Sequence, residues 1–121
     1  MFSVSKNQTI AVRKDFDVIV ARSRVRDLAR NIGLGTTDQA RISLAASSAA
    51  RALGLGESCQ GEIVIEAMNG RERACLRVTC RTYSVQEGVT ASTFSEAKFM
   101  ADEITVQEGS NGTQVTLVKW K

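Results

Sequence analysis

The sequence predicts an α+β fold built as a two-layer sandwich, in which helices cover one face of a mostly antiparallel sheet. Three observations lead to this fold class. Stretches with the alternation of half-buried strands and stretches with helical spacing follow one another in the order β-α-α-β-β-α-β-β. The chain has 121 residues, of which 43% are hydrophobic, and this suits one domain with a single core. No internal repeat or linker interrupts the pattern.

The first strand and the first helix are expected near the N-terminus. Residues 8–12 alternate weakly and follow a polar segment, residues 1–7, that we expect to be frayed. Asp17 is the expected N-cap of a helix that ends near Ile32, because glycines follow at positions 33 and 35. The apolar stripe of this helix comprises Val18, Ala21, Val25, Leu28, Ala29 and Ile32.

A second, alanine-rich helix is expected from Thr36 to about position 53. Thr36 and Gln39 have capping-box spacing, and Asp38 places a negative charge in the first turn, where the helix dipole favours it. Six alanines between positions 40 and 52 leave a thin helix that other elements can approach closely. Gly54 and Gly56 supply the C-cap. We therefore expect this helix to be the central packed element.

Two strands that form a hairpin are expected next. Residues 62–67 alternate between apolar and polar side chains, and residues 74–80 do the same. The pair Asn69-Gly70 between them is a hairpin signal, so we expect antiparallel pairing. The face expected to be buried carries Ile63, Ile65, Ala67, Ala74, Leu76, Val78 and Cys80.

The last part of the chain predicts one short helix and two strands. Thr93 and Glu96 have capping-box spacing and open a helix that reaches about position 101. Residues 104–106 and 114–121 are the expected strands, and the Asn-Gly pair at positions 111 and 112 favours a turn with positive φ between them. Trp120 is expected to be a packing residue on the last strand.

Composition narrows the function classes. Sixteen basic and thirteen acidic residues give a net charge of +3, which is too small to require a polyanionic partner. The basic excess is N-terminal, because residues 1–60 carry nine Lys or Arg and five Asp or Glu. No apolar run approaches the ~20 residues of a membrane span. We therefore expect a cytoplasmic protein without a membrane partner.

The cysteines and the missing histidines exclude several chemistries. The chain has an odd number of cysteines, Cys59, Cys75 and Cys80, and no two of them form a Cys-x-x-Cys pair. We therefore expect reduced, structural thiols. The chain has no histidine, which excludes a Ser-His-Asp or Cys-His nucleophile and a histidine-bearing zinc site. We expect no metal centre of these kinds.

Three arginines recur along the first helix. Arg22, Arg26 and Arg30 lie at i, i+4 and i+8, which places them on one exposed line. One interpretation is a solvated face partly neutralised by Asp27. The other is a docking surface for an acidic partner, because arginine pairs well with carboxylates at interfaces.

The stretch from Gly33 to Leu53, together with the ending Gly-Thr-Gln-Val-Thr-Leu-Val-Lys-Trp at 112–120, resembles the anti-sigma-factor serine kinases and switch kinases of bacterial partner-switching systems. These proteins belong to the GHKL (Bergerat-fold) ATPase superfamily. The resemblance runs the length of the chain and implies the histidine-kinase-like ATPase fold. It also implies a signalling role exerted through protein partners.

The positions that carry nucleotide chemistry in this family are altered here. Aligned on residues 38–42, the family's catalytic Glu corresponds to Ser48 and its Mg²⁺-binding Asn corresponds to Ala52. The adenine-binding Asp of the family's Asp-x-Gly-x-Gly motif falls at about Thr82. The segment from there to Ser92 is short for the family's lid and has one glycine, Gly88. The resemblance is therefore to a degenerate member with a shortened lid.

Three functions follow from these observations. The first is a non-catalytic, pseudokinase-like regulator that binds a sigma factor, a STAS-domain antagonist or a PP2C-type phosphatase, without ATP or Mg²⁺ as cofactors. The second is an active ATPase or serine/threonine kinase that binds Mg²⁺-ATP at a displaced site, with Asp38, Glu57 or Glu62 as the replacement carboxylate. The third, nucleic-acid binding through the arginine line, is disfavoured by the modest charge and few aromatic residues. Homodimerisation is left open.

Overall fold

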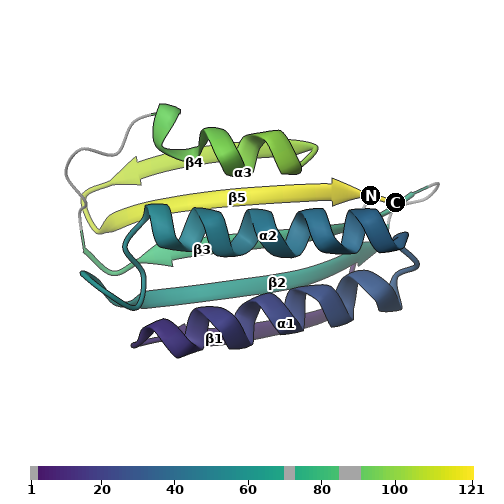
Figure 1. The fold of residues 1–121 in the computed structure, drawn as a ribbon, viewed down its shortest axis with the longest axis horizontal. Helices are drawn as coiled ribbons and strands as arrows, with labels where there is room; N and C mark the ends of the chain where they lie inside the picture. The colour runs from purple at the N-terminus through teal and green to yellow at the C-terminus, as the bar shows by residue number, and fades with distance from the viewer. Residues whose placement is uncertain (1–2, 70–72, 85–90) are drawn as a thin grey trace.

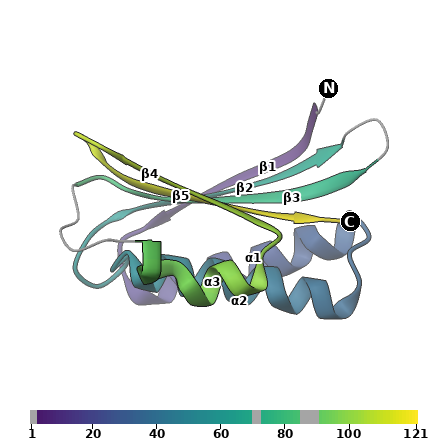
Figure 2. The same cartoon turned by 90° about the horizontal axis from the view of Figure 1, so that it is seen from above.

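The computed structural model describes residues 3–69, 73–84 and 91–121, which form one five-stranded sheet with helices on a single face (Figures 1 and 2). The strand order is β1-β2-β3-β5-β4, and every neighbouring pair is antiparallel. The predicted α+β sandwich and its element order are confirmed. The elements are β1 (Ser3–Val12), α1 (Asp15–Asn31), α2 (Thr36–Ala52), β2 (Gly61–Asn69), β3 (Ala74–Thr82), η1 (Ala91–Phe94), α3 (Ser95–Met100), β4 (Glu103–Gly109) and β5 (Gly112–Trp120).

The core lies between the helices and the sheet. Helix α1 packs on β1 and β2, α2 packs on β3 and β5, and α3 lies beside α2 near β4 (Figure 1). Ala45 and Ala49 of α2 are fully buried, so the thin helix approaches the strands closely, as its alanines predict. Of the strand residues expected in the core, Ala74 is only half-buried, and the others are fully buried.

The cap predicted for α1 is wrong by three positions. Lys14 is the N-cap, and Asp17 occupies the third helical position. The Asp17 carboxylate accepts hydrogen bonds from the backbone N–H of Arg13 at 2.9 Å and of Lys14 at 3.2 Å. The Arg13 hydrogen bond in particular holds the pKa of Asp17 below its ordinary value. Asp17 therefore stabilises the start of α1 by reaching back to the chain before it.

The two predicted capping boxes are also wrong. Helix α2 begins at Thr36 as expected, but Gly35 is its N-cap, and Gln39 Nε2 donates to the Leu34 carbonyl at 2.8 Å. Thr93 lies in η1, and α3 follows with Phe94 at the N-cap and no side-chain capping bond. The spacing pattern places the two N-caps at Thr36 and Thr93, whereas the structure places them one residue away, at Gly35 and Phe94.

Both long helices end in the same way. Gly33 and Gly54 have φ of 91° and 76°, a left-handed conformation that suits glycine. Their N–H groups donate to the carbonyls of Arg30 and Arg51, and the following leucines, Leu34 and Leu55, donate to carbonyls one residue earlier. These are Schellman motifs with buried leucines. The predicted C-cap at Gly54 is confirmed, whereas Gly35 belongs to the start of α2 and not to the end of α1.

The strands are longer than their alternation suggests. Strand β1 begins at Ser3, so the expected fraying of residues 1–7 is wrong from residue 3 onward, because β2 extends to Asn69 and supplies pairing partners beyond a bulge between Val4 and Lys6. Strands β4 and β5 turn at Ser110 and Asn111, and Gly112 has φ of 146°. The predicted Gly70 turn and Gly88 lie outside the described residues.

Candidate functional site

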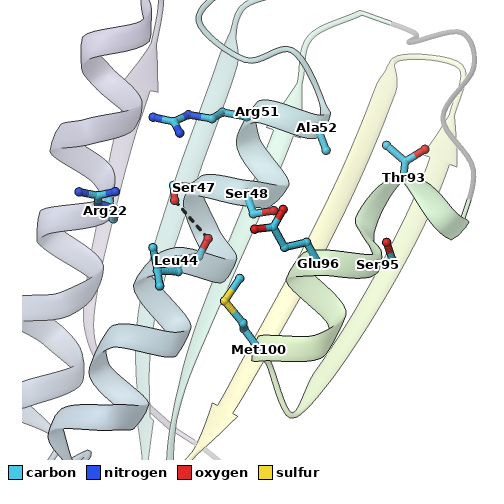
Figure 3. Close-up of a pocket in the computed structure, with 10 residues that line it drawn as sticks. All are labelled: Arg22, Leu44, Ser47, Ser48, Arg51, Ala52, Thr93, Ser95, Glu96 and Met100. Carbon is cyan, nitrogen blue, oxygen red and sulfur yellow. Dashed lines mark hydrogen bonds between the residues drawn. The ribbon is translucent and has the colours of Figure 1, made fainter.

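The strongest candidate site is a hollow of about 500 Å³ between the three helices (Figure 3). It contains both α2 positions at which the family resemblance places catalytic and metal-binding residues, Ser48 and Ala52. The two lie four residues apart and therefore share the flank of α2 that faces α3. In the described part of the chain, the lining comprises Arg22, Leu44, Ser47, Ser48, Arg51, Ala52, Thr93, Ser95, Glu96 and Met100.

The polar groups of the hollow come from opposite sides. Arg22 of α1 and Arg51 of α2 supply guanidinium groups, and both side chains are exposed. Glu96 of α3 supplies a carboxylate, and Figure 3 shows its side chain directed toward Ser48. Ser47 Oγ donates to the Leu44 carbonyl at 3.1 Å, so this hydroxyl is already used inside α2.

Thr82, the position matched to the adenine-binding Asp, does not line this hollow. Its side chain is buried where β3 meets the start of β5. Thr82 Oγ1 donates to the Ser84 carbonyl at 2.7 Å and accepts the N–H of Thr113 at 2.9 Å. The hydroxyl therefore joins two strands, while Ser48 and Ala52 lie together elsewhere.

The three carboxylates considered as replacements also lie outside the hollow. Asp38 is 3.4 Å from Lys119 Nζ at the start of α2, and Glu57 is exposed in the loop after α2. Glu62 lies on the sheet face opposite the helices, where its carboxylate accepts a hydrogen bond from the Tyr83 hydroxyl at 3.2 Å. Among the described residues that line the hollow, the only carboxylate is that of Glu96.

Glu96 was therefore the residue that sequence reasoning missed. Its spacing from Thr93 is that of a capping box, and this interpretation leaves out the alternative that its carboxylate lines a hollow beside α2. The available signal was an acidic residue in the first turn of the helix that follows the family's lid. A helix of six residues has too little periodicity to predict which side faces α2.

The structure separates the three arginines of α1. All three are exposed as predicted, but Arg30 pairs with Asp27 at 3.3 Å. Arg22 and Arg26 border a second hollow, of about 350 Å³, between α1 and α2. The interpretation of a partly neutralised, solvated face thus describes Arg30, whereas the other two arginines lie beside concave surface.

The cysteines give no reactive centre. Cys59, Cys75 and Cys80 are free thiols, and burial raises the pKa of Cys80 to about 12. A thiol with so high a pKa is a poor nucleophile at neutral pH. Within residues 3–69, 73–84 and 91–121, no cluster of His, Cys, Asp or Glu could hold a metal ion. In the same ranges, no helix has the length and hydropathy needed to cross a bilayer.

Comparisons with known proteins identify a shared fold. No protein-family model matches the sequence, and no curated protein matches it. Among solved structures, the crystal structure of the RsbU and RsbW domains of Rv1364c from Mycobacterium tuberculosis superimposes with a TM-score of 0.69 at 20% identity. The match covers 97% of this chain and 33% of that chain, so this protein spans about a third of its length.

Proposed function

We propose that this protein is a non-catalytic regulator of the partner-switching type. In this proposal a GHKL-like domain has kept its scaffold and its protein-binding surface and has lost nucleotide chemistry. Two observations support it: the resemblance of the Gly33 to Leu53 stretch to anti-sigma-factor kinases, and the fold shared with the structure of the RsbU and RsbW domains of Rv1364c. The protein would act in the cytoplasm on a sigma factor, a STAS-domain antagonist or a PP2C-type phosphatase.

The observation that carries the proposal is the chemistry of the hollow beside α2. Mg²⁺ prefers oxygen ligands, and phosphoryl transfer needs a base and a cation held in fixed positions. At the matched positions α2 offers a hydroxyl at Ser48 and a methyl group at Ala52. Thr82 lies outside the hollow, and its hydroxyl is engaged between β3 and β5. A catalytic carboxylate, a metal ligand and an adenine partner are thus replaced together.

A second candidate rests on Glu96. Its carboxylate lines the same hollow and points toward Ser48, so it could serve as the base of a displaced ATPase or kinase site (Figure 3). Against this candidate, one carboxylate supplies either a base or a metal ligand, and phosphoryl transfer needs both. We therefore give preference to the regulator.

Thermal unfolding with and without Mg²⁺-ATP tests the proposal. A ligand of micromolar affinity at millimolar concentration stabilises a folded protein by ~4 kcal/mol, which corresponds to a rise of more than about 10 °C in Tm for a chain of this size. The regulator predicts no change in Tm. A rise of this size would overturn the regulator, and a rise that disappears in Glu96→Gln would assign the nucleotide to the hollow. Glu108→Gln, at an exposed residue outside the hollow, is the matched control.

A further inference from the structure

Two hollows join across the outer surface of α2. The hollow at Ser48 and the smaller one between α1 and α2 share two lining residues, Arg22 and Leu44. The two hollows therefore adjoin at these residues, and we call the pair, which extends from α1 past α2 to α3, the α2 groove. The smaller hollow is lined by Ile19, Arg22, Ser23, Arg26, Ala40, Ser43 and Leu44.

The α2 groove exposes apolar side chains beside the serines of its lining. Ile19 and Leu44 are 44% and 45% exposed, although both belong to helices whose other large apolar side chains are mostly buried. Met100 of α3 also lines the groove, and Figure 3 shows it on the α3 side of α2, whereas Leu44 lies on the α1 side. Apolar side chains exposed at neighbouring positions in a concave surface mark a contact site for another apolar surface.

The rim of the groove carries an uneven charge. Arg22, Arg26 and Arg51 border it, and Glu96 is the single carboxylate among its described lining residues. Within the described part of the chain, none of these three arginines forms an ion pair. By contrast, Arg77 and Arg81 on the uncovered sheet face pair with Glu66 and Glu62. The groove therefore has cationic charge available to a partner.

We propose that the α2 groove docks an amphipathic helical segment of the partner protein, with its apolar stripe on Leu44 and an acidic flank facing Arg22, Arg26 and Arg51. This inference rests on the proposed function and specifies the partner's contact surface. Two adjoining hollows that both present the exposed Leu44 suit the anchor side chains of one amphipathic helix. A nucleic acid fits less well, because none of the lining residues that the structure describes is aromatic and could stack on a base, and Glu96 repels phosphate.

Designed peptides test this inference without knowledge of the natural partner. Three fluorescein-labelled amphipathic helices of about 16 residues share one leucine stripe at i, i+4 and i+7 and carry Glu, Gln or Lys along one flank. Fluorescence anisotropy gives their dissociation constants. We expect the Glu peptide to bind at least ~10-fold more tightly than the Lys peptide at low salt, with a smaller difference at high salt.

Matched variants locate the binding surface. Leu44→Asp and Arg26→Glu should each weaken binding of the Glu peptide by about tenfold or more. Leu44→Asp places a charge among the exposed apolar side chains, and Arg26→Glu reverses a charge at the rim. Phe99→Asp and Arg24→Glu make the same chemical changes at exposed residues that do not line the groove. These two controls should stay within about twofold of the unmodified protein.

Each outcome decides the inference. Equal binding of the three peptides, no binding, or the same loss in the controls overturns it, and so does displacement of the Glu peptide by an equal concentration of a single-stranded oligonucleotide. The Mg²⁺-ATP measurement tests the proposed function separately from the peptide experiment. A nucleotide-induced rise in Tm contradicts the proposed function whatever the peptides do, whereas peptide failure with unchanged Tm contradicts only the groove.

Discussion

The two ends of helix α2 are built differently. At the N-terminal end, Lys119 Nζ lies 3.4 Å from Asp38 and 3.0 Å from Asp102, so one nearly buried ammonium joins α2, β5 and the turn after α3. At the C-terminal end, Ser48 and Ala52 border a hollow of about 500 Å³. The scaffold is thus tied together at one end of the helix, and small side chains at the other end leave space.

The same contrast holds around the circumference of α2. The side facing the sheet carries fully buried alanines such as Ala45 and Ala49, where any added methylene meets another element. Ala52 points toward α3 and borders the hollow (Figure 3). The contacts of α2 that hold the fold together therefore lie on its sheet-facing side and at its N-terminal end. Substitutions elsewhere on its surface can change the chemistry of the hollow without disturbing those contacts.

The largest expected effect compares these two sides directly. Ala49→Leu should destabilise the protein by about 2–3 kcal/mol, because the larger side chain overpacks the contact between α2 and the sheet. Ala52→Leu should change the unfolding free energy by less than about 0.5 kcal/mol, because the hollow accepts the added atoms. Urea unfolding measures both. Equal destabilisation by the two substitutions would show that the hollow is not free space.

The next effect concerns the tied end of α2. Lys119→Met should cost about 1–2 kcal/mol, because it leaves two carboxylates without their shared cation; both are partly exposed, which keeps the cost below that of a fully buried pair. Arg51→Met, at the open end, should cost less than about 0.5 kcal/mol. The comparison fails if the two variants lose the same stability in urea.

A smaller effect should appear in the pH dependence of stability. Burial raises the pKa of Asp102, but hydrogen bonds from the Trp120 N–H and the Lys119 ammonium outweigh it, so the pKa lies below its ordinary value of 3.8. A carboxyl whose pKa is lowered by folding stabilises the protein above its unfolded pKa, and this contribution is lost as the pH falls through the folded pKa.

Unfolding free energies measured between pH 6 and about pH 3 should therefore fall less steeply for Asp102→Asn than for the unmodified protein. Asp17 has a lowered pKa as well, so a residual slope remains in the variant. Parallel pH profiles for the two proteins would show that the Asp102 carboxylate does not stabilise the ion-paired N-terminal end of α2.

The smallest expected change is in the attempted repair of the open end. Ser48→Glu together with Ala52→Asn restores the family's residues on α2, but no adenine-binding carboxylate is added at Thr82. Because positioning and charge act together in phosphoryl transfer, ATP hydrolysis by the double variant should stay at background. Turnover above background, measured as released phosphate, would mean that the rest of a nucleotide site is in place.

The fold could be predicted from sequence because its signals are long and repeated. The alanine-rich spacing of α2 and the alternation in β2 and β3 each extend over many residues, so a local error does not change the fold class. The caps were missed because Gly35 and Lys14 act through backbone conformation, and their neighbours carry the more conspicuous polar side chains.

The site could be predicted in part. The resemblance places Ser48 and Ala52 four residues apart on a long helix, and the structure brings both to the hollow, whereas their match to the family's catalytic and metal-binding residues stays a prediction. Glu96 was not predicted as a lining residue, since its relation to Ser48 depends on how a six-residue helix packs against α2. The separation of Arg30 from Arg22 and Arg26 likewise depends on an ion pair and on the position of α2, which helical spacing alone does not contain.

Calorimetric titration of the protein with Mg²⁺-ATP tests the central claim most directly, because it measures occupancy of the open end of α2 without relying on stability or turnover. The account predicts only the heat of dilution up to millimolar nucleotide. A saturable isotherm with a dissociation constant below about 100 μM, or ~5.5 kcal/mol of binding free energy, would contradict it, and loss of that isotherm in Glu96→Gln would place the nucleotide in the hollow.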